Sequence, residues 1–154
     1  RAQCQANAEQ YYAIGANEVA KATREAPSRI PFLLKDPRGH KDFYDSLARH
    51  DSKGSGNTMR SFQGGRPSMY TMEEAIRTIP TPTLIICGDE DDHCITPSLF
   101  LKKTIPASGL AMFPKSGHVL NLEEPSLFNE TLDRFVGLVE AGHWPPRDPR
   151  SLRA

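Results

Sequence analysis

Two stretches of sequence decide the fold: TLIICGDEDD at residues 83–92 and LAMFPKSGHVLNLEEP at residues 110–125. The first places Asp91 just beyond an apolar, β-branched run, and the second places His118 just beyond another apolar run. A run without polar alternation is typical of a strand that is covered on both faces. Ligands and catalytic groups gather at the carboxyl ends of the strands in an open parallel sheet. The two stretches therefore predict an α/β fold that carries an acid/base pair, Asp91 and His118.

The residues around these stretches predict a parallel strand–helix–strand unit followed by a C-terminal helix. Residues 83–87 form the first expected strand, Pro97 can begin a helix to about residue 103, and residues 109–113 form the second strand. Such crossover units are right-handed in nearly all cases. Pro125 opens a further helix with one apolar face that can cover the sheet. That face consists of Leu127, Phe128, Leu132, Phe135, Val136 and Val139. Residues 141–154 are expected to be an irregular tail.

Residues 1–80 predict a mainly helical and rather polar segment. A helix over residues 5–26 is expected to bend at Gly15, and Asp36 with Pro37 predicts an N-cap for a helix through about residue 50. Thr71 and Glu74 form a capping-box pattern for a helix to residue 79. In this segment, residues 30–34 are the strand candidate, residues 54–57 have turn chemistry, and residues 59–62 can form a short helix.

Composition and charge exclude some classes of function. The chain has 154 residues with 19 basic and 19 acidic side chains, so its charge gives no reason to expect a nucleic-acid partner or an anionic membrane. No apolar run reaches the roughly 18 to 20 residues of a membrane span, and the first residues lack the pattern of a secretory signal. At least one of the three cysteines is left unpaired, which favours a reducing compartment. The expected location is the cytoplasm.

The spaced features of residues 82–136 resemble the C-terminal part of an α/β-hydrolase. They are an apolar strand ending in GDED at residues 88–91, the pair Thr96 and Pro97, a second strand, Gly117 with His118, and EEP at residues 123–125 before an amphipathic helix. The resemblance implies that residues 81–140 are the C-terminal part of the hydrolase core, and that residues 1–80 are cap-like. It also implies that the N-terminal half, with the nucleophile elbow and most of the sheet, is missing from this chain.

The same resemblance implies that Asp91 is the acid and His118 the base of a catalytic triad. An imidazole can take a proton from a nucleophile near neutral pH if its tautomer is fixed, and a buried carboxylate that accepts the Nδ1 hydrogen fixes it. From the residues alone, Asp89, Asp91 and Asp92 are hard to separate, and the spacing of the family motif selects Asp91. Without the joint pattern, a histidine after a strand is more often structural, and an acidic loop is usually a solvated turn.

A nucleophile is the part of the triad that the residues do not supply. An elbow needs small residues two positions before and after the reactive side chain. Ser55 and Ser116 lack such neighbours, whereas Cys4 has Ala2 and Ala6. Because no strand precedes Cys4 in an alanine-rich helix, a cysteine packed in the cap helix is the better interpretation. The chain alone is therefore expected to be inactive.

Metal and cofactor sites are not expected from the sequence. Asp89 and Asp91 occupy two places of a calcium-loop pattern, but Cys94 stands where that pattern needs glycine, and Phe100 stands where it needs glutamate. His93 and Cys94 are adjacent and have no second ligand pair at zinc spacing.

Three functional hypotheses remain. The first is part of an α/β-hydrolase that acts by a nucleophile–histidine–aspartate triad on a small ester-like or related substrate, with Asp91 and His118 present and the nucleophile in the missing half. The second is a non-catalytic fragment, which needs that half or a second copy of the chain to cover its sheet edge. The third is an enzyme that uses Cys4 as its own nucleophile.

Overall fold

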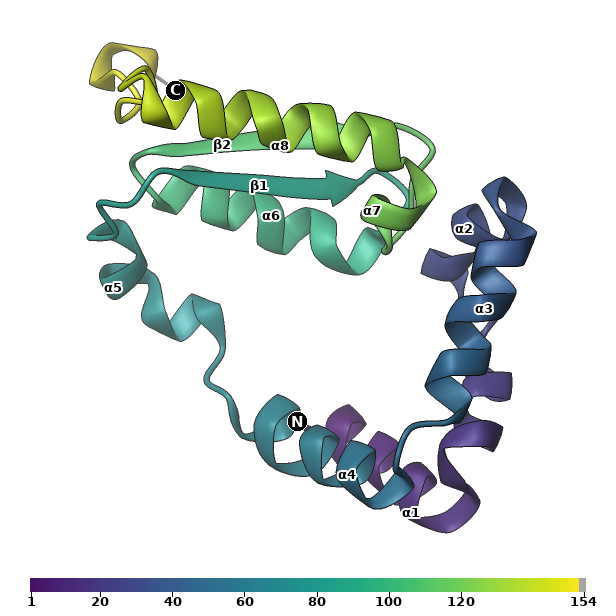
Figure 1. Cartoon of the computed structure of the whole chain (residues 1–154). Coiled ribbons are helices and arrows are strands. Elements are labelled where there is room, and N and C mark those ends of the chain that lie inside the picture. Colours follow the sequence, from purple (N-terminus) through teal and green to yellow (C-terminus); the bar gives the residue numbers. More distant parts are fainter. Residues whose placement is uncertain (153–154) are drawn as a thin grey trace. The chain divides into compact units, whose positions relative to one another are not determined.

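The computed structural model describes residues 1–152 (Figure 1). The chain divides into two compact units, residues 1–71 and residues 72 onward, and the short helix α5 (Glu73–Arg77) belongs to the second unit. In the described residues, no helix combines the length and the apolar character that crossing a membrane requires.

The first unit is helical. Its elements are α1 (Ala2–Thr23), η1 (Pro27–Arg29), α2 (Ile30–Lys35), α3 (Pro37–Ala48), α4 (Ser52–Asn57), η2 (Thr58–Gln63) and most of η3 (Met69–Met72). The expected bend in the first helix is confirmed, because Gly15 has φ 80° and interrupts α1. After the bend, the Ala16 amide donates a hydrogen bond to Ser52 Oγ at 2.9 Å, which ties α1 to α4. Asp36 caps α3 by accepting a hydrogen bond from the Gly39 amide, as its position predicts.

Three local predictions for this unit are wrong. Residues 30–34 lie in a helix and not in a strand, because the described residues of this unit offer no neighbouring strand and Pro31 fits the first turn of α2. Residues 54–57 lie in α4, whose start is capped by Asp51 through the Gly54 amide. Thr71 does not cap a helix, since its hydroxyl donates to the Ser68 carbonyl and α5 begins only at Glu73.

The second unit contains the parallel strands β1 (Thr83–Gly88) and β2 (Ser108–Phe113), which pair from Thr83 opposite Ser108 to Gly88 opposite Phe113. The helix α6 (Asp92–Thr104) connects them and packs on both strands, and α8 (Pro125–Glu140) lies on the other side of the sheet (Figure 1). Both strands and the C-terminal helix agree with the sequence prediction. The connecting helix begins five residues earlier than Pro97, because its first turn forms directly after Asp91.

The segment after α8 is anchored although it is largely irregular. The Trp144 indole donates a hydrogen bond to the Ala107 carbonyl at 2.9 Å, and its ring meets Phe135 edge to face at 4.9 Å between centroids. A Cβ at Gly109 would lie 2.5 Å from the Trp144 ring, so this glycine allows the indole to rest on β2. A short 3-10 turn (Pro149–Leu152) follows. The sequence predicts an irregular tail over residues 141–154, of which 153–154 lie outside the described residues, and it does not predict the Trp144 anchor.

Candidate functional site

The candidate site lies where the two loops that follow β1 and β2 meet. At the end of β1, a Cβ on Gly88 would lie 2.2 Å from the Ser116 carbonyl oxygen and 2.4 Å from that of Gly117. Real Cβ atoms do not come so close, so only glycine lets the backbone of the two loops touch at this point. The Glu90 amide also donates to the Ser116 carbonyl at 2.9 Å. These contacts hold the loop that carries His118 against the loop that carries Asp91.

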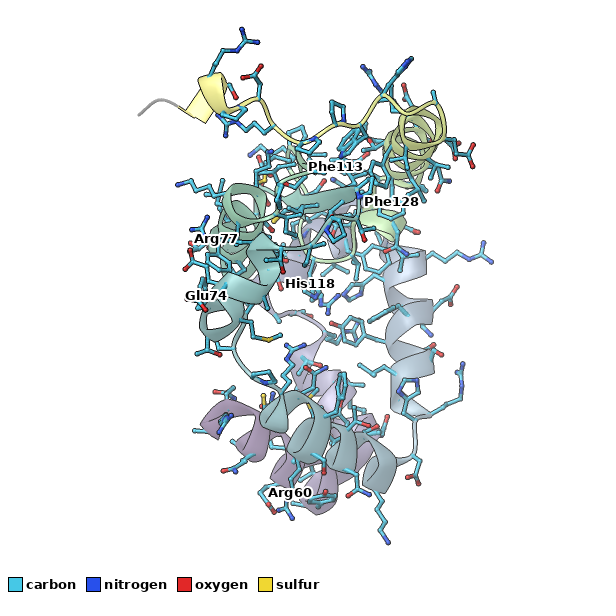
Figure 2. The ribbon with its side chains drawn as sticks, turned by 90° about the vertical axis from the view of Figure 1, so that its left-hand side faces the viewer. Arg60, Glu74, Arg77, Phe113, His118 and Phe128 are labelled. Carbon is cyan, nitrogen blue, oxygen red and sulfur yellow. The ribbon has the colours of Figure 1, made fainter. Side chains whose placement is uncertain are left out.

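Asp91 and His118 are in direct contact. The Nδ1 atom of His118 lies 2.6 Å from Oδ2 of Asp91, while the two side chains are 46% and 6% exposed, respectively. The carboxylate is therefore buried and the imidazole opens to the surface of the unit. Figure 2 labels His118 in the loop that follows β2, the strand that ends at Phe113. A buried carboxylate next to Nδ1 favours the tautomer with a hydrogen on Nδ1, and this leaves the Nε2 lone pair to accept a proton.

Glu123 fixes the loop around His118. It is the last residue of the short helix α7 (Leu120–Glu123). One carboxylate oxygen accepts a hydrogen bond from the Gly117 amide at 2.7 Å, and the other accepts from the Val119 amide at 3.1 Å. Glu123 is only 6% exposed, so these bonds form away from bulk solvent. The backbone on both sides of His118 is therefore fixed by one buried carboxylate.

A second carboxylate supports the same loop from the β1 side. Asp89 Oδ1 accepts a hydrogen bond from the Ser116 amide at 3.3 Å, and the Asp89 amide donates to the Phe113 carbonyl at 3.0 Å. Lys115 takes φ 57° in this turn and lies 3.4 Å from Glu90 across the two loops. Asp89 thus orders the turn, while Asp91 is the carboxylate that reaches the imidazole.

Cys94 is a third member of the site that the sequence did not indicate. It lies in the first turn of α6, and its Sγ is 3.8 Å from Nδ1 of His118. Burial, together with the hydrogen bond and the charge of Asp91, raises the pKa of the Cys94 thiol to about 12. The group is therefore a protonated thiol near neutral pH and a poor nucleophile. Asp91, Cys94 and His118 each offer one ligand atom, and these atoms lie within 4.8 Å of one another.

None of the three nucleophile candidates lies in a tight strand-to-helix turn of the described residues. Cys4 is in the first turn of α1 and Ser55 is inside α4, so both belong to the helical unit and not to a strand-to-helix turn. Ser116 is completely buried, and its hydroxyl donates a hydrogen bond to the Pro114 carbonyl at 3.2 Å. Each of the three side chains has a structural setting that does not match a nucleophile elbow.

Comparison with solved structures decides the fold. MenH from S. aureus superposes with a TM-score of 0.80 at 17% identity, over 87% of this chain and 50% of MenH. The chain has the α/β-hydrolase fold. A second solved structure, Est816, described as an N-acyl homoserine lactone degrading enzyme, matches with a TM-score of 0.51 at 23% identity, over 75% of this chain and 50% of that one.

Sequence relatives are consistent with this fold. One is a Bacillus subtilis (strain 168) protein named for 2-succinyl-6-hydroxy-2,4-cyclohexadiene-1-carboxylate synthase activity, 29% identical over 89 residues, or 57% of this chain and 31% of the relative. Another is the 2-hydroxymuconate semialdehyde hydrolase of Pseudomonas putida, 32% identical over 82 residues, or 53% of this chain and 29% of the relative. The matches thus span about a third of these relatives. No protein-family model matches the chain.

Two features of the site are not predicted by the sequence, for different reasons. The resemblance gives Glu123 no role of its own, although its spacing of five residues from His118 fits a carboxylate that folds back on the histidine loop. Cys94 has no ligand pair close to it in sequence, because its neighbour His118 comes from the loop after the next strand. The sequence does contain a signal for Cys94. It lies three residues after Asp91, in the first helical turn, and so falls near the end of one strand while His118 follows the other.

Proposed function

We propose that this chain supplies the acid and the base, Asp91 and His118, of an α/β-hydrolase that works by a nucleophile–histidine–aspartate triad. The observation that carries the proposal is the 2.6 Å contact between a buried carboxylate and a half-exposed imidazole at the ends of two adjacent parallel strands. The relationship to hydrolases supports it. The proposal assigns the nucleophile and the oxyanion hole to residues other than these 154.

The roles of the residues follow from the geometry. Asp91 accepts the Nδ1 hydrogen of His118, keeps Nε2 free of hydrogen, and stabilises the imidazolium that forms when Nε2 takes the proton of the nucleophile. His118 then returns this proton to the leaving group. The clamp from Glu123 to the amides of Gly117 and Val119 keeps the ring in place through both transfers.

The proposed substrate is a small molecule with an ester or a related activated carbonyl group. A triad of this kind works on a carbon that can accept a nucleophile and carry negative charge on oxygen. The names of two similar proteins, a semialdehyde hydrolase and a lactone-degrading enzyme, describe substrates of this chemistry.

The test uses a version of the protein extended at its N-terminus together with the 154-residue chain. We expect an activity probe for serine and cysteine hydrolases to label the extended protein and not the chain itself. In the extended protein, His118→Ala is expected to lower the hydrolysis of a simple activated ester by about 10³-fold or more, because the triad base is lost. A rate within twofold of the parent would show that His118 is not the base. Labelling of the chain alone that disappears in Cys4→Ala would support the Cys4 hypothesis.

A second candidate function, a non-catalytic module that depends on a partner, is favoured by the surface of the second unit. In the described residues, β1 pairs with β2 and has no strand on its other edge. A groove beside this region runs between Leu84 of β1 and the apolar side chains of α8. Leu127, Leu132 and Val136 of α8 are each about 40% exposed.

This alternative makes a different prediction in solution. The proposed partner is either the N-terminal half of a hydrolase fold or a second copy of the chain. An inert chain that forms a stable dimer in light scattering, and that dissociates on Leu132→Glu, supports self-association through this face. A monomer that gains activity only in the extended protein supports the hydrolase.

A further inference from the structure

The site brings together an oxygen, a nitrogen and a sulfur atom, each of which can act as a metal ligand. Oδ2 of Asp91 and Sγ of Cys94 lie 2.6 Å and 3.8 Å, respectively, from Nδ1 of His118. In residues 1–152 these three side chains form a cluster whose ligand atoms all lie within 4.8 Å of one another. Asp91 is buried just before α6 and Cys94 sits in its first turn, so two of the three donors belong to one rigid element.

We propose that the Asp91–Cys94–His118 triangle binds a zinc ion, or a similar thiophilic divalent cation, through Nδ1 of the histidine. Zinc takes oxygen, nitrogen and sulfur ligands at about 2.0–2.3 Å in a tetrahedral arrangement, which puts a sulfur and a nitrogen ligand about 3.6 Å apart. The observed separation of 3.8 Å between Sγ and Nδ1 fits this edge. The ligand set, a carboxylate, a thiolate and a neutral imidazole, carries two negative charges that match the ion.

The geometry also makes the ion and the catalytic hydrogen bond mutually exclusive. Nitrogen and oxygen ligands of a tetrahedral zinc ion lie about 3.3 Å apart, whereas Nδ1 and Oδ2 are 2.6 Å apart. The His118 ring must therefore move away from Asp91 by about 0.7 Å to admit the ion. Because His118 is half-exposed, its ring has room for this small movement. A water molecule can then reach the ion as its fourth ligand.

Binding changes which ring nitrogen of His118 carries hydrogen. The ion takes the place of the hydrogen on Nδ1 and of the hydrogen on the Cys94 thiol, because a coordinating thiol is deprotonated outright. A neutral imidazole bound through Nδ1 carries its hydrogen on Nε2, so one of the two displaced protons ends on Nε2 and the other is released to solvent. In that state Nε2 is a donor and cannot take a proton from a nucleophile. The ion thus switches the base off.

The metal site stands on the donor geometry alone, while its inhibitory effect rests on the proposed hydrolase function. The experiment therefore measures binding on the 154-residue chain and needs no activity. Cobalt(II) is titrated into the purified chain, because a bound thiolate gives a strong charge-transfer band in the near ultraviolet. We expect one equivalent to produce the band and zinc to remove it by competition.

Variants identify the ligands. Cys94→Ser is expected to abolish the band, and the matched control Cys4→Ser, in the other unit, is expected to leave it unchanged. Asp91→Asn is expected to weaken cobalt binding at least tenfold, since one charged ligand is lost. Equal bands in the parent and in Cys94→Ser would overturn the proposal.

Nitrogen-15 spectra of the histidine rings provide the second readout. One equivalent of zinc is expected to move the hydrogen of His118 from Nδ1 to Nε2, and to leave the exposed His93 and His143 at their metal-free positions. Zinc-dependent shifts confined to other histidines would show adventitious binding and would contradict the site. If zinc binds as proposed but fails to inhibit the extended enzyme, the metal site stands and the catalytic role of His118 is wrong.

Discussion

The two units of the molecule treat buried polar side chains differently. In the unit that starts at residue 72, Asp91 and Glu123 are buried carboxylates whose oxygens accept hydrogen bonds from His118 and from two backbone amides. In the helical unit, His40 is completely buried, and its Nε2 donates a hydrogen bond to the Arg24 carbonyl at 2.8 Å. Its Nδ1 and a buried nitrogen of Arg29 have no hydrogen-bond partner among the described residues.

The difference indicates that the buried polar groups of the α/β unit hold a candidate site, whereas those of the helical unit belong to a packed core. A buried carboxylate is costly unless charges or donors compensate it, and the α/β unit keeps two of them within one pair of loops. The helical unit instead surrounds His40 with the rings of Phe32 and Tyr44, at centroid distances of 5.5 Å and 4.8 Å. The first arrangement fixes a reactive group in one orientation. The second fills a core.

The largest expected effect on stability comes from a substitution that disrupts the close backbone contact between the two loops. Gly88→Ala places a methyl group against the backbone oxygens of Ser116 and Gly117, which cannot move away as a flexible side chain can. We expect a loss of about 3 kcal/mol or more in the free energy of unfolding, measured with urea. Gly137→Ala is the control, because open space surrounds its Cβ position in α8 and a small gain of up to about 1 kcal/mol is expected. Similar midpoints for the two variants would contradict the close approach.

A smaller effect on stability is expected from weakening the hydrogen bonds that Glu123 accepts from the amides of Gly117 and Val119. Glu123→Gln keeps the shape of the side chain but replaces one oxygen by an NH₂ group, so either the Gly117 or the Val119 amide loses its acceptor. The expected loss is about 1–3 kcal/mol, and the amide that lost its bond should exchange its hydrogen faster. Glu140→Gln, at the exposed end of α8, should change neither quantity appreciably. Unchanged exchange at both amides would mean that the clamp does not hold the loop.

The smallest expected effect is a difference in rate between cysteines of the two units. Since burial and Asp91 raise the pKa of Cys94 to about 12, its thiolate is scarce below that pH and its alkylation by iodoacetamide at pH 8 should be slow. The alkylation rate should rise with pH up to about 12. Asp91→Asn should increase the rate at pH 8 at least tenfold, because it removes the charge and the hydrogen bond that raise the pKa of Cys94. Mass spectrometry of the peptides that contain Cys4 and Cys94 follows each site separately. Faster labelling of Cys94 than of Cys4 at pH 8 would contradict the raised pKa.

Local sequence was sufficient where one pattern had one structural meaning. The apolar runs at residues 83–87 and 109–113 became β1 and β2, the interruption at Gly15 became a bend, and the pairing of the two strands in parallel brought Asp91 and His118 together. Their catalytic role stays a prediction.

Local sequence was insufficient where tertiary contacts decide the structure. The apolar run at residues 30–34 suits a strand or a helix, and without a neighbouring strand it became α2. The glycine-rich residues of α4 are helical because they pack on α1, where Gly56 lies directly against the Tyr12 ring. Cys94 meets His118 only through the crossover between two strands, so no short motif predicts the contact.

The most direct test of the central claim is the hydrogen on Nδ1 of His118. Nuclear magnetic resonance of the metal-free chain should show this hydrogen far downfield and protected from exchange, as expected for a bond to the buried Asp91 carboxylate at 2.6 Å. The signal should disappear in Asp91→Asn or shift strongly upfield, while the fold is retained. A His118 ring in the parent chain with rapidly exchanging hydrogens and solvent-like nitrogen shifts would contradict the account.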